Sequence, residues 1–217
     1  MIVLERNLFM DGGYSTVKGT AKASFTEKKS EFIGHIMHTE TEEEAVNFIN
    51  EIRSEHRKAK HNVYAYILRD GNSTRYSDDG EPQGTAGVPV LEVLRKEGLT
   101  DVCCVVTRYF GGILLGGGGL VRAYSHSAKI AIDTAERLIM CLCRPVTVTA
   151  DYNLYGKISY MLPEFEVKLL DTDYGENVTL KMLVKISFLK QLTEKLADIA
   201  NGNISIEQGD EYYDNFA

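Results

Sequence analysis

The chain has 217 residues, 44% of them hydrophobic, and a formal net charge of −7. This length and composition predict one large domain or two small ones that fold without disulfides. The acidic balance argues against a protein that coats nucleic acid over its whole surface. The longest apolar run, six residues, is too short to cross a membrane, so we expect no membrane partner.

The start of the chain, MIVLERNLFMDGG, lacks the basic region, the long apolar core and the cleavage site of an export signal, so we expect a cytosolic protein. The four cysteines stand at positions 103, 104, 141 and 143, a spacing that fits neither zinc ligands nor redox pairs. We therefore interpret them as buried, reduced thiols and predict no metal and no cofactor.

The first part of the chain alternates between strand and helix patterns. Residues 17–25 and 31–38 have the two-residue period of paired strands, and Thr41 with Glu44 forms a capping-box pattern before a helix that reaches about residue 58. A strand at 63–68 and a polar loop at 69–84 precede a helix at 85–96, which has Pro89 in its first turn. A central strand at 101–107 and a last helix at about 120–140 complete the order β-β-α-β-α-β-α.

The remaining residues read as β-α-β-β-α-β, which is the ferredoxin-like plan, and the tail EYYDNFA reads as loose. The fold class is therefore α+β with two domains, 1–143 and 144–217, divided near Arg144. The first domain carries 17 basic and 19 acidic residues and the second carries 7 and 12, so the first is the better partner for phosphates.

Glycine is concentrated in one loop, where six of the nine residues from 111 to 119 are glycine. The loop matches neither the ATPase nor the dinucleotide fingerprint, but it leads into a helix, whose first amides and positive dipole end favour an anion. A tight strand-to-helix turn with close packing is the alternative interpretation. The glycines of the candidate anion site are Gly111, Gly112, Gly116, Gly117, Gly118 and Gly119.

Arg122 lies in the first turns of that helix, where a cation opposes the helix dipole and needs a negative partner. One possible partner is the carboxylate group Asp78, Asp79 and Glu81, which would form a structural ion-pair network. The other is a bound phosphate, with Arg108 or Arg75 as a second clamp. The same three carboxylates also raise the hypothesis of a Mg²⁺ site, although Asp-Gly and Glu-Pro are equally good turn signals.

A row of basic residues lies near the end of the first predicted helix. Arg53, Arg57, Lys60 and His61 would share a face if the helix persisted, and Tyr64, Tyr66 and Tyr76 nearby could offer stacking surfaces for nucleic acid. Acidic residues at the start of this helix and basic residues at its end are what dipole compensation alone produces, and this is the favoured interpretation of the row. His35, His38 and His56 have no ligand spacing and are interpreted as structural or solvent-facing.

Four segments carry a family resemblance: KKSEFIGH, KHNVYAY, SDDGEPQGTAGVPVLEVL and VVTRYFGGILLGGGGLVRAYSHSA. They closely resemble the signature segments of the IMPACT family, specifically its two-domain bacterial (YigZ-like) branch. The resemblance implies a first domain with the fold of the second domain of a small-subunit ribosomal protein, and a second domain similar to late domains of elongation factor G. It also implies a link to translational control.

These observations lead to three hypotheses. The first is a non-enzymatic cytosolic protein that binds RNA, or a ribosome or translation-factor surface, through an anion-holding patch of Lys60, His61, Arg75, Arg108, Arg122 and the glycine loop. The second is a Mg²⁺-dependent enzyme acting on a phosphorylated small molecule, with Asp78, Asp79 and Glu81 as its carboxylates. The third is a regulatory module that docks a protein and holds no phosphate-containing ligand.

Overall fold

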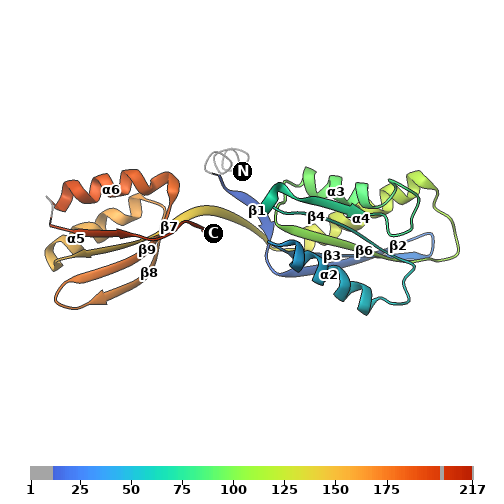
Figure 1. Cartoon of the computed structure of the whole chain (residues 1–217), viewed down its shortest axis with the longest axis horizontal. Coiled ribbons are helices and arrows are strands. Elements are labelled where there is room, and N and C mark those ends of the chain that lie inside the picture. Colours follow the sequence, from blue (N-terminus) through green and yellow to red (C-terminus); the bar gives the residue numbers. More distant parts are fainter. Residues whose placement is uncertain (1–11, 201–202, 217) are drawn as a thin grey trace. The chain divides into compact units, whose positions relative to one another are not determined.

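The computed structural model describes residues 12–200 and 203–216. The chain forms two compact units, which divide between Leu138 and Ile139 (Figure 1). The residues at 1–11, on which the export-signal prediction depends, lie outside the described part of the chain. Within that part, no helix combines the length and the apolar character needed to cross a bilayer.

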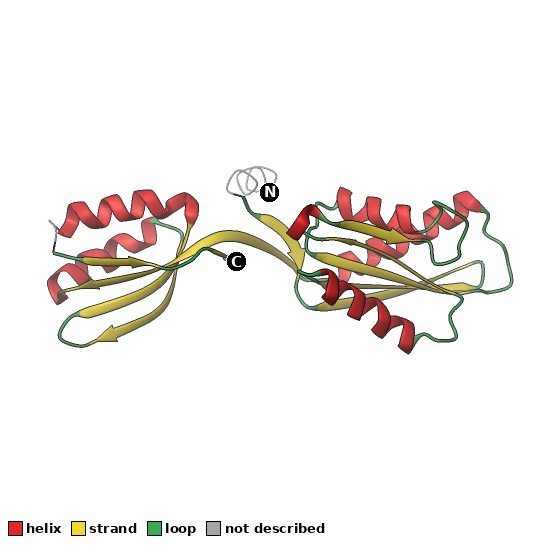
Figure 2. Ribbon diagram, in the orientation of Figure 1, coloured by secondary structure: helices red, strands yellow, loops and turns green. Residues whose placement is uncertain are grey.

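The first unit contains a five-stranded antiparallel sheet in the order β2-β3-β6-β4-β5. Helices α3 and α4 cover one face of this sheet and α2 covers the other (Figure 2). Its elements are β1 (Tyr14–Val17), β2 (Thr20–Glu27), β3 (Ser30–His38), α2 (Glu42–Glu55), β4 (His61–Ile67), the 3-10 turn η2 (Asp70–Asn72), β5 (Thr74–Ser77), α3 (Gly87–Lys96), β6 (Val102–Tyr109) and α4 (Gly117–Thr134). The predicted element order is confirmed, but β1 and β5 are additional strands, and β5 lies within the predicted polar loop.

Strand β6 is central and is buried on both faces, as its continuous apolar run predicts. Cys103 and Val105 pack against α2, whereas Cys104 and Val106 pack under α3 and α4. All four cysteines are buried free thiols, and burial raises the pKa of Cys104 to about 12. The interpretation as reduced core cysteines is confirmed.

Helix α2 begins with the predicted capping box. The amide of Glu44 donates to Thr41 Oγ1 at 3.2 Å, and the amide of Thr41 donates to Glu44 Oε2 at 3.3 Å. The helix ends at Glu55, with His56 as its C-cap, which is earlier than the predicted end near residue 58. The predicted row of basic residues therefore does not share one helical face.

The second unit has the ferredoxin-like order that the sequence predicts. Its antiparallel strands lie in the order β10-β7-β9-β8, and α5 and α6 pack with them around one apolar core. The elements are β7 (Arg137–Ala150), α5 (Tyr152–Met161), the 3-10 turn η3 (Leu162–Glu164), β8 (Val167–Tyr174), β9 (Val178–Lys185), α6 (Ile186–Ala200), β10 (Ser205–Gln208) and β11 (Tyr212–Asn215).

Two predictions around β7 are wrong. Helix α4 ends at Thr134 rather than near residue 140, and the tail is not loose, because residues 212–215 form β11. Strand β11 pairs with residues 140–143 of β7, so the tail draws this segment into a strand. The predicted boundary near Arg144 lies further along the same strand than the division between the two units.

Candidate functional site

The turn between β2 and β3 consists of two lysines in a conformation that glycine and asparagine prefer. Lys28 has a φ of 47° and Lys29 a φ of 64°, and the flanking Glu27 and Ser30 are paired across the turn. Two positive φ angles in a two-residue hairpin loop give the tight turn whose twist matches the strands, at a cost on the order of 1 kcal/mol per non-glycine residue. Backbone strain of this kind is concentrated at functional sites.

The loop after β6 passes directly against this turn. A Cβ atom added to Gly111 would lie 2.0 Å from the carbonyl carbon and oxygen of Lys29, so only glycine fits there. The amide of Gly111 donates to the buried Ser30 hydroxyl at 3.1 Å. This amide is therefore occupied, and Gly111 fastens the loop to the hairpin rather than facing a ligand.

Helix α4 begins without a protein cap. Its N-cap is Gly116, with a φ of 73° and no side chain to accept a hydrogen bond. Within the described residues, the amides of Gly117, Gly118 and Gly119 have no hydrogen-bond partner. Helix starts of this kind present bare N–H groups and the positive end of the helix dipole.

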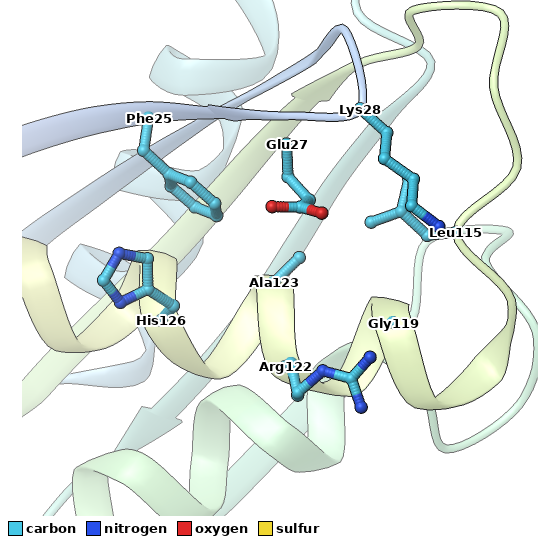
Figure 3. Close-up of a pocket in the computed structure, with 8 residues that line it drawn as sticks. All are labelled: Phe25, Glu27, Lys28, Leu115, Gly119, Arg122, Ala123 and His126. Carbon is cyan, nitrogen blue, oxygen red and sulfur yellow. The ribbon is translucent and has the colours of Figure 1, made fainter.

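A cavity of about 270 Å³ lies between the β2–β3 turn and the first turns of α4, and we call it the α4 cavity. Figure 3 shows Glu27 and Lys28 reaching from the turn toward the helix, with Arg122 beside its first turn. The ring of Phe25 meets that of His126 edge to face, with 4.7 Å between centroids. The lining residues are Phe25, Glu27, Lys28, Leu115, Gly119, Arg122, Ala123 and His126.

Arg122 and Lys28 are the cations of this cavity, and neither has an ion-pair or hydrogen-bond partner within the described residues. The carboxylates that the sequence offered as partners for Arg122 are engaged elsewhere. The ion-pair network offered for Arg122 is therefore not formed, and the carboxylate that lines its cavity is that of Glu27. Lys28, rather than Arg108 or Arg75, is the second cation of the cavity.

Arg108 is buried and is not among the residues that line the α4 cavity. Its Nη1 donates to Glu81 Oε1 at 2.5 Å, and the Tyr124 hydroxyl donates to the same oxygen at 2.8 Å. His61 completes this buried cluster, with its Nε2 3.7 Å from that oxygen and its Nδ1 2.7 Å from the backbone oxygen of Asp79. Burial and the adjacent carboxylate raise the pKa of Tyr124 well above its usual value, so the hydroxyl keeps its proton.

The other two carboxylates have structural partners. Asp78 accepts hydrogen bonds from the amides of Gly84, Ala86 and Gly87 at 2.8 to 3.0 Å, and so caps α3, whose own N-cap residue, Ala86, cannot. Asp79 accepts from Arg53 Nη2 at 3.0 Å and from the amide of Asn62 at 2.6 Å. This geometry favours the turn and ion-pair interpretation over the Mg²⁺ hypothesis. Within the described residues no cluster of three or more acidic, histidine or cysteine side chains has metal-site geometry.

The remaining predicted site residues do not gather at the α4 cavity. Lys60 lies over the Phe110 ring, with its Nζ 5.6 Å from the ring centroid. Arg75 pairs with Glu42 of α2 at 3.3 Å, which places it with the helix on the other sheet face. The glycines at 112 and 116 have positive φ and shape the loop. The predicted patch is therefore three groups: the α4 cavity, the buried Arg108 cluster, and separate surface cations.

Sequence reasoning missed the β2–β3 turn as part of the site. Lys28, Glu27 and His126 line the cavity, and Ser30 anchors the loop. One sequence signal could have indicated this turn: the pair Lys28-Lys29 separates two segments that alternate as strands. A two-residue hairpin turn places its side chains at the end of the sheet. The position of that sheet end next to α4 depends on tertiary packing, and no local sequence pattern indicates it.

His35 and His56 form a buried pair on the α2 side of the sheet. Their ring centroids are 5.1 Å apart, and His56 Nδ1 lies 3.0 Å from the Tyr109 hydroxyl. The structural interpretation fits both residues, because both are buried. Burial, with a smaller contribution from His56, lowers the pKa of His35 to about 4.

The lowered pKa of His35 predicts acid sensitivity. Between pH 6.5 and pH 4 the imidazole of His35 is protonated in the unfolded chain but neutral in the folded one. The free energy of unfolding is therefore highest above pH 6.5 and decreases as the pH falls toward 4. We expect the free energy of unfolding to fall by about 3 kcal/mol more in the unmodified protein than in His35→Gln over this range. Urea denaturation of both proteins at several pH values measures the difference, and parallel pH profiles would contradict the assignment.

Comparisons with known proteins give a consistent result. A family model described as the Impact N-terminal domain matches residues 28–132, and another, a domain of unknown function named DUF1949, matches residues 148–203. The chain is 40% identical over 201 residues to the IMPACT family member YvyE of Bacillus subtilis, covering 92% of this chain and 93% of that protein. It is 34% identical to YigZ of Escherichia coli, covering 82% and 89%.

A crystal structure described as that of a hypothetical protein is similar to the chain, with a TM-score of 0.59 and 31% sequence identity. The similarity covers 89% of this chain and 96% of that one.

Proposed function

This chain belongs to the IMPACT family, and from that premise we propose that it is a cytosolic, non-enzymatic binding protein linked to translation, which holds RNA phosphates at the α4 cavity. The RNA is free or part of a ribosomal surface. The observation that carries the proposal is the pairing of two unpartnered cations, Lys28 and Arg122, with a helix start that has no protein cap.

Physical chemistry supports phosphate as the ligand. The two cations exceed the single carboxylate of the cavity, Glu27, and together with the bare amides they give a positive local potential, although the whole chain carries −7. The tight lysine turn and the close fit of Gly111 against the Lys29 backbone fix the main chain beside Lys28, so the cost of ordering that main chain is met during folding. The carboxylate of Glu27 offers an acceptor for a ribose hydroxyl beside the phosphate.

The test is fluorescence anisotropy with a single-stranded RNA of about 20 nucleotides over a salt series starting near 50 mM. We expect Arg122→Glu and Lys28→Glu each to weaken binding about tenfold, because each removes a phosphate contact and adds repulsion. Neutral substitutions should lower the slope of log affinity against log salt by about 0.7 per lost contact.

Arg75→Ala is the matched control, because Arg75 is equally a surface arginine of this unit but is paired with Glu42. Its RNA affinity should stay within about twofold. Absence of RNA binding at the lowest salt, or equal losses in Arg75→Ala and Arg122→Ala, would overturn the proposal.

A further inference from the structure

The glycine loop exposes an unusual share of this unit's large apolar side chains. Among the described residues of the unit, six such side chains are more than a third exposed, and four of them belong to the segment 110–121. We call these four the apolar loop surface: Phe110 (44% exposed), Ile113 (41%), Leu114 (82%) and Val121 (38%).

Folding of the unit does not account for this exposure. Leu115 packs against the main core of the unit, whereas the preceding Leu114 is exposed to solvent. Burying one leucine side chain is worth roughly 1.5 to 3 kcal/mol, which Leu114 does not gain here. Exposed apolar side chains concentrated in one segment and bordered by polar residues are typical of interaction surfaces; here three precede α4 and Val121 lies in its second turn.

The surroundings of the apolar loop surface are mainly basic, with Glu27 and Glu31 as the acidic residues of the neighbouring β2–β3 turn. The chain has no acidic residue between Arg108 and Asp133, and none between Glu55 and Asp70. Lys60 lies over the ring of Phe110, and the backbone of Lys29 touches Gly111. The β2–β3 turn, the loop after α2 and the loop before α4 lie at the same end of the unit (Figure 1). The basic rim comprises Lys29, Arg57, Lys58 and Lys60.

We infer that the apolar loop surface and its basic rim dock an amphipathic protein segment with an apolar face and acidic flanks. Charge complementarity selects the acidic flanks, because the cations of the rim outnumber the carboxylates of Glu27 and Glu31 beside the same turn. The apolar face follows from Ile113 and Leu114, since aliphatic side chains gain binding energy only where another apolar surface removes them from water. A phosphate backbone supplies no such surface, so this inference stands independently of the RNA proposal.

The experiment uses a labelled helical peptide of about 18 residues with leucines along one face and glutamates elsewhere, titrated with the full chain. Two matched peptides replace every glutamate by lysine, or every leucine by serine. We expect micromolar affinity for the first peptide and at least about tenfold weaker binding for either control.

The protein variant is the double substitution Ile113→Ser with Leu114→Ser, which alters exposed loop residues. It should weaken peptide binding about tenfold and leave RNA affinity within about twofold. Val46→Ser is the control, because Val46 is similarly exposed but lies on α2. Circular dichroism confirms that each variant is folded.

Three outcomes would overturn the inference. They are no binding of the glutamate–leucine peptide at about 1 mM, equal binding of the lysine peptide, and no effect of the double substitution. If the double substitution instead weakens binding to RNA or to phosphatidylglycerol vesicles and leaves the peptide unaffected, the surface serves that ligand and the inference is wrong.

Discussion

Replacing Glu81 with glutamine is expected to lower the free energy of unfolding by about 3 to 5 kcal/mol. Glutamine keeps the shape and an oxygen that accepts from Arg108 and Tyr124, so the substitution removes chiefly the charge. The side chains of Glu81 and Arg108 are only 4% and 6% exposed, and removal of one partner leaves the guanidinium buried without a counter-charge. Urea denaturation with an unchanged m-value measures this loss.

A double-mutant cycle measures the coupling free energy between Glu81 and Arg108. Arg108→Met alone should also be strongly destabilising, whereas Glu81→Leu combined with Arg108→Met should be less destabilising than the sum of the single changes. Glu136→Gln is the control, because it removes an exposed partner of Lys18 at 3.0 Å and should cost less than about 1 kcal/mol. Strictly additive single changes at positions 81 and 108 would contradict an energetically coupled pair.

Replacing Gly111 with alanine is expected to cost roughly 3 kcal/mol and to weaken RNA binding. The added methyl group would overlap the carbonyl group of Lys29, so either the loop or the β2–β3 turn must move. That movement would also break the hydrogen bond from the Gly111 amide to Ser30 and displace Lys28 from the α4 cavity. Thermal or urea unfolding gives the first effect and anisotropy gives the second.

Gly118→Ala is the matched control for this substitution. Gly118 lies within α4, and a Cβ there would meet only Arg122 Nη1, at 3.8 Å. Alanine in a helix is favoured over glycine by about 1 kcal/mol, so the stability should stay level or rise. A Gly111→Ala protein as stable as Gly118→Ala would show that the contact with the turn is not tight.

Local sequence patterns predicted most of the fold. The capping box at Thr41 and the apolar run of β6 each correspond to the expected element, because short-range hydrogen bonding and side-chain period determine them. The end of α4 was not predictable in the same way. Its apolar spacing continues past Thr134, but the following residues form β7, which pairs with β1 and with β11, two strands far away in the sequence.

The candidate site was predicted in part. Glycine density predicts a loop that leads into a helix start, and the helix after the loop has Gly116 as its N-cap and no side-chain cap. The choice among arginines failed because burial is a tertiary property. Arg108 and Arg122 have similar local contexts, yet one is neutralised inside the unit by Glu81 and the other stands at the α4 cavity. Lys28 was missed because hairpin tips have no signature that relates them to a distant helix.

The pairing of β7 has a consequence for biosynthesis. Both β10 and β11 hydrogen-bond to β7, and both are synthesised well after it. Until they emerge, residues 140–143 and 146–149 of β7 lack these partners, although every residue of the preceding unit has already been translated. A nascent chain that pauses before β10 would therefore present an open strand edge to any neighbouring polypeptide.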